Sequence, residues 1–131
     1  MYVWLGWLNV AFLAVMTAPY WLRFLNQRTL RLKGGAYGKT IKVLRALHKP
    51  LGVAVVLIAA VHGYLALGAF RLHTGTILGT SVLLTALFGL SFYLAKKKFL
   101  FTWHKRLALL SILLLLVHLL FPGAVYYLLR I

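Results

Sequence analysis

The chain has 131 residues, of which 63% are hydrophobic, and its 15 Lys and Arg are not balanced by any Asp or Glu. A soluble domain of this length could not bury so much apolar surface, so we expect lipid to surround most of the chain. The absence of Cys, Asp and Glu excludes disulfides, thiolate metal sites and the carboxylates that calcium sites and most hydrolases need. The basic residues are interpreted as flanking membrane spans. The expected partner is therefore the lipid bilayer and not nucleic acid.

Hydrophobic stretches of spanning length predict an all-α membrane protein, a four-transmembrane-helix bundle that forms one domain over residues 1–131. The expected helices cover about residues 2–22, 44–69, 76–95 and 100–121. The first stretch lacks the basic start of a secretory signal, so we expect it to be a retained helix. Residues 124–131 are expected to form a short interfacial tail.

Residues 23–43 form the only long polar segment, which we expect to be a basic cytoplasmic loop lying against anionic lipid. Its sequence KGGAYGKT is similar to a phosphate-binding P-loop. A P-loop has four residues between its glycines, whereas Gly34 and Gly38 have three between them. We therefore do not expect nucleotide binding.

The distribution of charge predicts the orientation in the membrane. Eight Lys and Arg fall in residues 23–49 and five in residues 96–106, whereas Arg71 and Arg130 alone fall on the other side of a four-helix topology. Basic loops are retained in the cytoplasm, so both basic segments are expected there and both termini outside. We expect an integral protein of a bacterial or archaeal cytoplasmic membrane.

Four of the five histidines form two pairs with the same spacing. His48 and His62 are fourteen residues apart in the second expected helix, and His104 and His118 are fourteen residues apart in the fourth. Fourteen steps of about 100° complete almost four turns, so each pair leaves one face of its helix. Along the axis, the two members of a pair are about 21 Å apart.

The second and fourth helices run in the same direction because the third returns between them. If they face each other, His48 is level with His104 and His62 with His118, and each level offers two neutral imidazoles. Such a pair supplies both axial ligands of a haem iron, so the sequence predicts two b haems stacked between these helices. A zinc or copper site needs three or four ligands, and a single histidine could simply bond to a neighbouring helix. Four histidines in two equal spacings favour haem.

Small residues accompany the histidines, as a flat porphyrin requires beside its ligands. The histidine faces of the second and fourth helices include Gly52 and Ser111. In the third helix, Gly79 falls near the depth of the outer pair and Gly89 near that of the inner pair. Such residues also serve ordinary packing between membrane helices.

Basic residues near the histidines are candidates for binding the anionic haem propionates. They are Arg45, Lys49, Lys105 and Arg106 at the inner level and Arg71 at the outer level. The alternative is that they only set topology or anchor the chain in lipid. His73 lies outside the paired pattern and is interpreted as a turn histidine rather than a propionate or quinone contact.

Two segments carry a family resemblance. His48-Lys49 with Leu51-Gly52 and then His62, and His104-Lys105-Arg106 followed by His118, resemble the ferric-reductase-like transmembrane domain and, in spacing, the cytochrome b superfamily. The resemblance covers about residues 44–121. It implies that these histidines ligate two b haems that carry electrons across the bilayer. Family members commonly have six helices, against the four expected here, and the chain has no Glu for the quinone motif of cytochrome b.

The expected function is transmembrane electron transfer, as the cytochrome b subunit of a larger oxidoreductase and without catalysis of its own. Its basic face would dock a redox partner protein with an acidic face, and quinone is a further candidate partner. One alternative is a stand-alone quinol or ferric reductase, with substrate at the outer haem near Arg71 and His73. Another is a haem-free scaffold subunit of a membrane complex.

Overall fold

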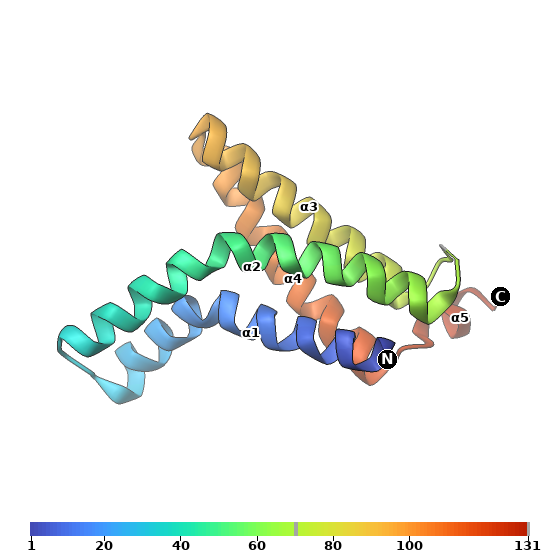
Figure 1. Cartoon of the computed structure of the whole chain (residues 1–131), viewed down its shortest axis with the longest axis horizontal. Helices are drawn as coiled ribbons and strands as arrows, with labels where there is room; N and C mark the ends of the chain where they lie inside the picture. Colours follow the sequence, from blue (N-terminus) through green and yellow to red (C-terminus); the bar gives the residue numbers. More distant parts are fainter. Residues whose placement is uncertain (70, 131) are drawn as a thin grey trace. The chain divides into compact units, whose positions relative to one another are not determined.

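The computed structural model describes residues 1–69 and 71–130, and over these residues the chain forms helices and no strand (Figure 1). The elements in order are α1 (Tyr2–Leu25), the π-helical turn η1 (Asn26–Leu30), α2 (Gly35–Leu67), α3 (Thr74–Ala95), α4 (Lys98–Leu120) and α5 (Ala124–Leu129). The described chain divides into two compact units, Met1–Ile58 and Ala59–Ile131. The boundary falls within α2.

Four helical segments are long and apolar enough to cross a membrane: Tyr2–Leu30, Gly35–Leu67, Thr74–Ala95 and Lys98–Leu120. Their surfaces carry large exposed side chains of the kind that lipid solvates, such as Leu57, Leu109 and Leu113. Buried side chains are few, and several are polar. The prediction of an all-helical chain with four helices long and apolar enough to span a membrane is confirmed over the described residues.

In the first unit, α1 and the 35–58 part of α2 run antiparallel (Figure 1). The turn between them is closed by Asn26, whose side-chain amide donates to the carbonyl of Leu32 while its oxygen accepts the Leu32 N–H. Arg31 takes a left-handed conformation with φ of 46° and ends the helical path. A left-handed residue at the end of a helix, with a polar side chain that bonds the following backbone, is a common way to reverse the chain.

The expected basic loop at residues 23–43 is mostly helical in the structure. Only residues 31–34 separate η1 from α2, which begins at Gly35 rather than near Leu44. The sequence shows where the apolar stretch begins, but this is not where the helix begins. Because Lys and Arg are good helix formers, the helix extends into the basic residues that precede the apolar stretch. At its other end α2 stops at Leu67, because Gly68 adopts φ of +64°.

In the second unit, α3 and α4 pack closely as an antiparallel pair (Figure 1). Lys96 turns the chain between them with φ of 55°. Buried Ser81 and Ser111 hydrogen-bond across the pair at 2.9 Å, so a polar contact joins the two helices away from their ends. The expected tail forms the short helix α5, and Ile131 lies outside the described residues.

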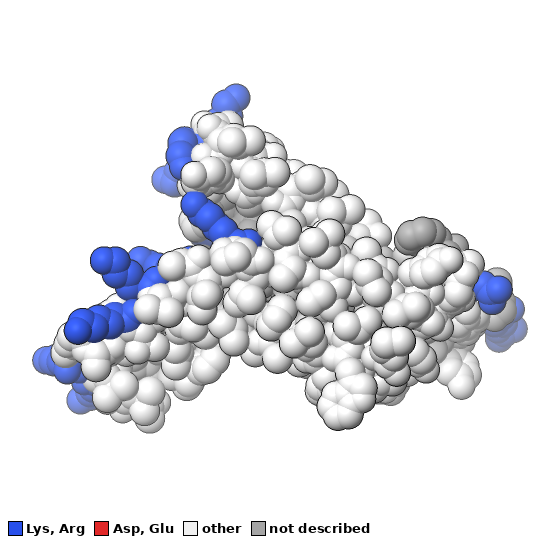
Figure 2. Space-filling view, in the orientation of Figure 1, with Lys and Arg blue, Asp and Glu red and all other residues white. Residues whose placement is uncertain are grey.

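Basic side chains gather at one end of each unit (Figure 2). In the first unit they cover the turn between α1 and α2, and in the second they cover the turn between α3 and α4. Each unit therefore separates an apolar body from a positively charged turn, as membrane hairpins do.

Candidate functional site

The four paired histidines lie on helices, as predicted. His48 and His62 are on α2, and His104 and His118 are on α4. All four are half-buried. His48 belongs to the first unit and the other three to the second.

His48 contacts α1. Its Nδ1 lies 3.2 Å from the carbonyl oxygen of Met16. A carbonyl oxygen only accepts, so Nδ1 carries the proton and Nε2 holds the lone pair of the neutral ring. One turn along α2, a β-carbon at Gly52 would lie 3.4 Å from the Met16 methyl group. The histidine face of α2 is therefore directed at α1 here.

His104 contacts α3 in the same manner. Its Nδ1 lies 2.8 Å from the carbonyl oxygen of Thr85, which again places the proton on Nδ1. The ring lies against Gly89, where a β-carbon would come within 2.9 Å of Nδ1 and 3.0 Å of Cε1. Only glycine leaves room for the imidazole at this place, which confirms the expectation that Gly89 lies close to the inner histidine of α4.

His118 also contacts α3, through a hydroxyl group. Its Nδ1 lies 2.9 Å from Oγ1 of Thr74, and the same oxygen lies 2.8 Å from the carbonyl oxygen of Pro122. The carbonyl can only accept, so Thr74 donates its single proton to Pro122 and accepts the Nδ1–H of His118. A β-carbon at Gly75 would lie 3.1 Å from Cε1 of His118.

The three histidines thus share one tautomer, with the proton on Nδ1 and the lone pair on Nε2. Histidines that bind a metal through one nitrogen commonly donate the other N–H to a carbonyl or hydroxyl, which fixes the ring and makes the ligating nitrogen more basic. The donor set therefore fits iron ligation through Nε2.

His62 and His73 complete the group in the second unit. His62 lies within electrostatic range of His118, as does His73. The ring of His73 meets that of His118 edge to face at 5.9 Å between centroids, and that of Tyr126 at 6.0 Å.

His73 differs in tautomer from His48, His104 and His118. It is the N-cap of α3, and its Nδ1 accepts the Gly75 N–H at 3.2 Å. Nδ1 therefore holds the lone pair, and the proton is on Nε2. This capping bond agrees with the interpretation of His73 as a turn histidine.

The five basic candidates take different positions. Lys105 lies over the ring of Phe101 at 4.9 Å, and Arg106 lies over that of Trp103 at 5.5 Å.

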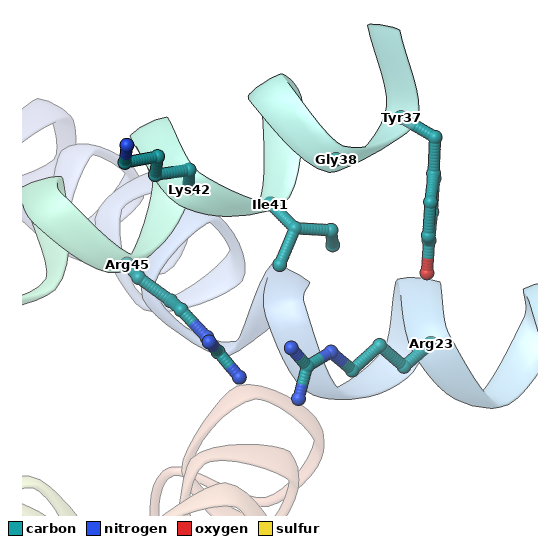
Figure 3. Close-up of a pocket in the computed structure, with 6 residues that line it drawn as sticks. All are labelled: Arg23, Tyr37, Gly38, Ile41, Lys42 and Arg45. Atoms are coloured by element: carbon teal, nitrogen blue, oxygen red, sulfur yellow. The ribbon is translucent and has the colours of Figure 1, made fainter. Parts of the chain in front are cut away.

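Arg71 lies in the connection before α3, where its carbonyl accepts from Thr76. Lys49 is exposed on α2 next to His48. Arg45 lines a pocket in the first unit (Figure 3).

The sequence did not single out the partners of the histidines. Thr74 lies just before the expected third helix, and Thr85 and Met16 contribute backbone carbonyls that no side-chain pattern reveals. One signal was present: Ser111 is midway between His104 and His118, so all three lie on one stripe of α4 at a spacing of seven. A heptad stripe is typical of a helix–helix contact.

Within residues 1–69 and 71–130, no group of three or more His, Cys, Asp or Glu side chains is placed to hold one metal ion. Comparison of the chain with protein-family models, with curated proteins and with solved structures finds no match.

Proposed function

We propose that this chain is the membrane electron-transfer subunit of a larger redox system and binds two b haems through paired histidines. His48 and His104 would ligate the inner haem, and His62 and His118 the outer one. The resemblance of the two histidine segments to the ferric-reductase-like domain supports the same assignment.

The observation that carries the proposal is the shared tautomer of His48, His104 and His118. Each Nδ1 lies within hydrogen-bond distance of an oxygen on a neighbouring helix, which accepts the Nδ1–H of the neutral ring. Histidines that served only to join helices would need no common tautomer. Three rings with the same polarity are suited to ligating metal.

The helices contribute position and environment. Acceptors from α1 and α3 fix the rings, and the apolar surface keeps water away from them. When bound, haem supplies one-electron chemistry at its iron, with a potential set by axial ligands, hydrogen bonding and burial. Two sites about 21 Å apart along the helices would link the two faces of the bilayer.

The charge distribution supports an orientation. The basic turns between α1 and α2 and between α3 and α4 would face the cytoplasm, with both termini outside, in a bacterial or archaeal cytoplasmic membrane. The same turns would dock a partner with an acidic face, because opposite charges speed encounter and fix orientation.

The test is a haem count by the pyridine haemochrome assay on single variants of the purified protein. H62A or H118A should each leave about one haem per chain, as should H48A or H104A, because each variant removes one axial ligand. H73N is the matched control: it keeps an N-cap acceptor on α3 and should keep both haems. Retention of two haems in every variant would show that these histidines are not the ligands.

The same preparation separates the alternatives. A colourless protein without a Soret band would favour the scaffold. Reduction of ferric chelates or oxidation of quinol by the chain without a partner would favour a stand-alone reductase.

A further inference from the structure

A pocket of about 440 Å³ lies in the first unit, near the turn between α1 and α2 (Figure 3). Its lining residues are Arg23, Tyr37, Gly38, Ile41, Lys42 and Arg45. Arg23 lies in the last turn of α1, and the others come from the first three turns of α2. The pocket is thus at the boundary between the apolar spans and the basic turn.

Two like charges converge in this pocket. Figure 3 shows the guanidinium groups of Arg23 and Arg45 pointing toward each other, while the hydroxyl of Tyr37 is directed toward α1 near the backbone end of Arg23. No carboxylate can separate them, because the chain has no Asp or Glu. Two cations that approach each other without an anion between them repel, and the repulsion is strongest where water is scarce. The arrangement therefore calls for an anion from outside the chain.

The shape and donors of the pocket select the anion. Arginine presents a planar fork of N–H groups that binds phosphate oxygens in pairs, and two such forks can hold one phosphate group between them. The ammonium of Lys42 is directed away and adds charge at the rim. Ile41, only 5% exposed, gives the pocket an apolar wall.

We propose that this pocket binds a phosphate group, and that its source in the membrane is the headgroup of an anionic phospholipid. The end of a transmembrane hairpin lies at the depth of lipid phosphates, and basic pockets between helices on the cytoplasmic side commonly hold anionic headgroups. The acyl chains would lie along exposed apolar side chains of the hairpin such as Trp21 and Val43. The assignment depends on the membrane placement of α1 and α2 and not on haem.

The test is native mass spectrometry of the detergent-purified full chain, titrated with phosphatidylglycerol and separately with phosphatidylcholine. Wild type should retain one phosphatidylglycerol at least about tenfold more tightly than phosphatidylcholine. R23Q and R45Q should each weaken retention about tenfold. R28Q and K39Q are matched controls, because they remove equal charge from the same turn at residues that do not line the pocket, and they should retain the lipid within about twofold of wild type.

A second experiment adds inorganic phosphate to the protein with bound phosphatidylglycerol. If it displaces phosphatidylglycerol at millimolar concentration and stabilises lipid-free protein, the source is free phosphate and the lipid assignment is overturned. Equal losses in R28Q, K39Q, R23Q and R45Q would show that only the total basic charge attracts lipid, and the pocket would then have no role. R23K and R45K guard against misfolding: they keep charge but lose the fork, and retention at the wild-type level would contradict paired binding of phosphate by arginine.

Haem content is measured in the same samples. If R45Q loses one haem per chain while retaining phosphatidylglycerol, Arg45 serves a propionate and the phosphate proposal fails.

Discussion

The imidazole of His104 lies against Gly89, and a β-carbon at that glycine would come within 2.9 Å of Nδ1. A β-carbon does not come this close to a non-bonded atom, so any larger residue must move the ring or separate α3 from α4. The ring is held by the Thr85 carbonyl at 2.8 Å, so movement also weakens that bond. The geometry of His104 thus depends on a glycine of another helix.

G89A should therefore disturb the inner histidine. We expect it to lose the inner haem and keep the outer one, so that the pyridine haemochrome assay gives about one haem per chain. G79A is the control, because a β-carbon at Gly79 would meet no atom within 4 Å. It should keep both haems and gain up to about 1 kcal/mol in helix propensity. Equal haem content in G89A and G79A would be incompatible with this arrangement.

Thr74 holds His118 through a hydroxyl that accepts the Nδ1–H. T74V keeps the shape of the side chain but removes the oxygen, so Nδ1 loses its acceptor and the ring loses its fixed tautomer. We expect roughly tenfold weaker retention of the outer haem and a shifted midpoint potential for that haem alone. Redox titration followed at the α-band measures both haems in one sample.

T74S restores an oxygen at the same place and should recover the wild-type potential. A T74V protein whose two potentials match those of wild type would show that the hydroxyl does not act on the ligand.

Local pattern was enough to predict the helices but not their contacts. Continuous apolar stretches located four spans, because a membrane helix must satisfy its backbone internally. They did not locate the start of α2, because the helix extends through Lys39 and Lys42 into the basic segment. Hydropathy indicates which part of a helix is surrounded by lipid, and α2 extends beyond that part.

The histidines could be found because spacing along one helix is a local property. Their partners depend on how separate helices meet. Gly79 and Gly89 look alike in sequence, yet only Gly89 lies against a histidine. Ser111 was expected to leave room for a porphyrin, but it hydrogen-bonds Ser81 in the closely packed α3–α4 pair. The rotation of each helix about its axis decided these outcomes, and sequence periodicity does not fix it.

The Ser81–Ser111 contact should contribute to the stability of the α3–α4 pair. Both side chains are buried, and the hydroxyls lie 2.9 Å apart. In a double-mutant cycle with S81A and S111A, unfolding in mixed micelles should give a coupling free energy of about 0.5–1.5 kcal/mol, as for other polar pairs in membranes. A parallel cycle with S91A in place of S81A should give none, because Ser91 is exposed. Coupling of the same size in both cycles would mean that the measured energy does not come from the direct bond.

The absence of cysteine makes the orientation directly measurable, because any introduced thiol is the only one in the chain. K33C lies between η1 and α2, K97C lies between α3 and α4, and L72C lies between α2 and α3. The excess of Lys and Arg near the η1–α2 and α3–α4 connections predicts that the thiols of K33C and K97C are cytoplasmic. In intact cells, a membrane-impermeant maleimide should label L72C and leave K33C and K97C unlabelled until the membrane is opened.

Each substitution removes at most one of fifteen basic residues, so the charge asymmetry that sets the orientation is preserved. Labelling of K33C and K97C in intact cells, with L72C protected, would invert the orientation and put the acidic partner and the phosphate pocket on the outer face.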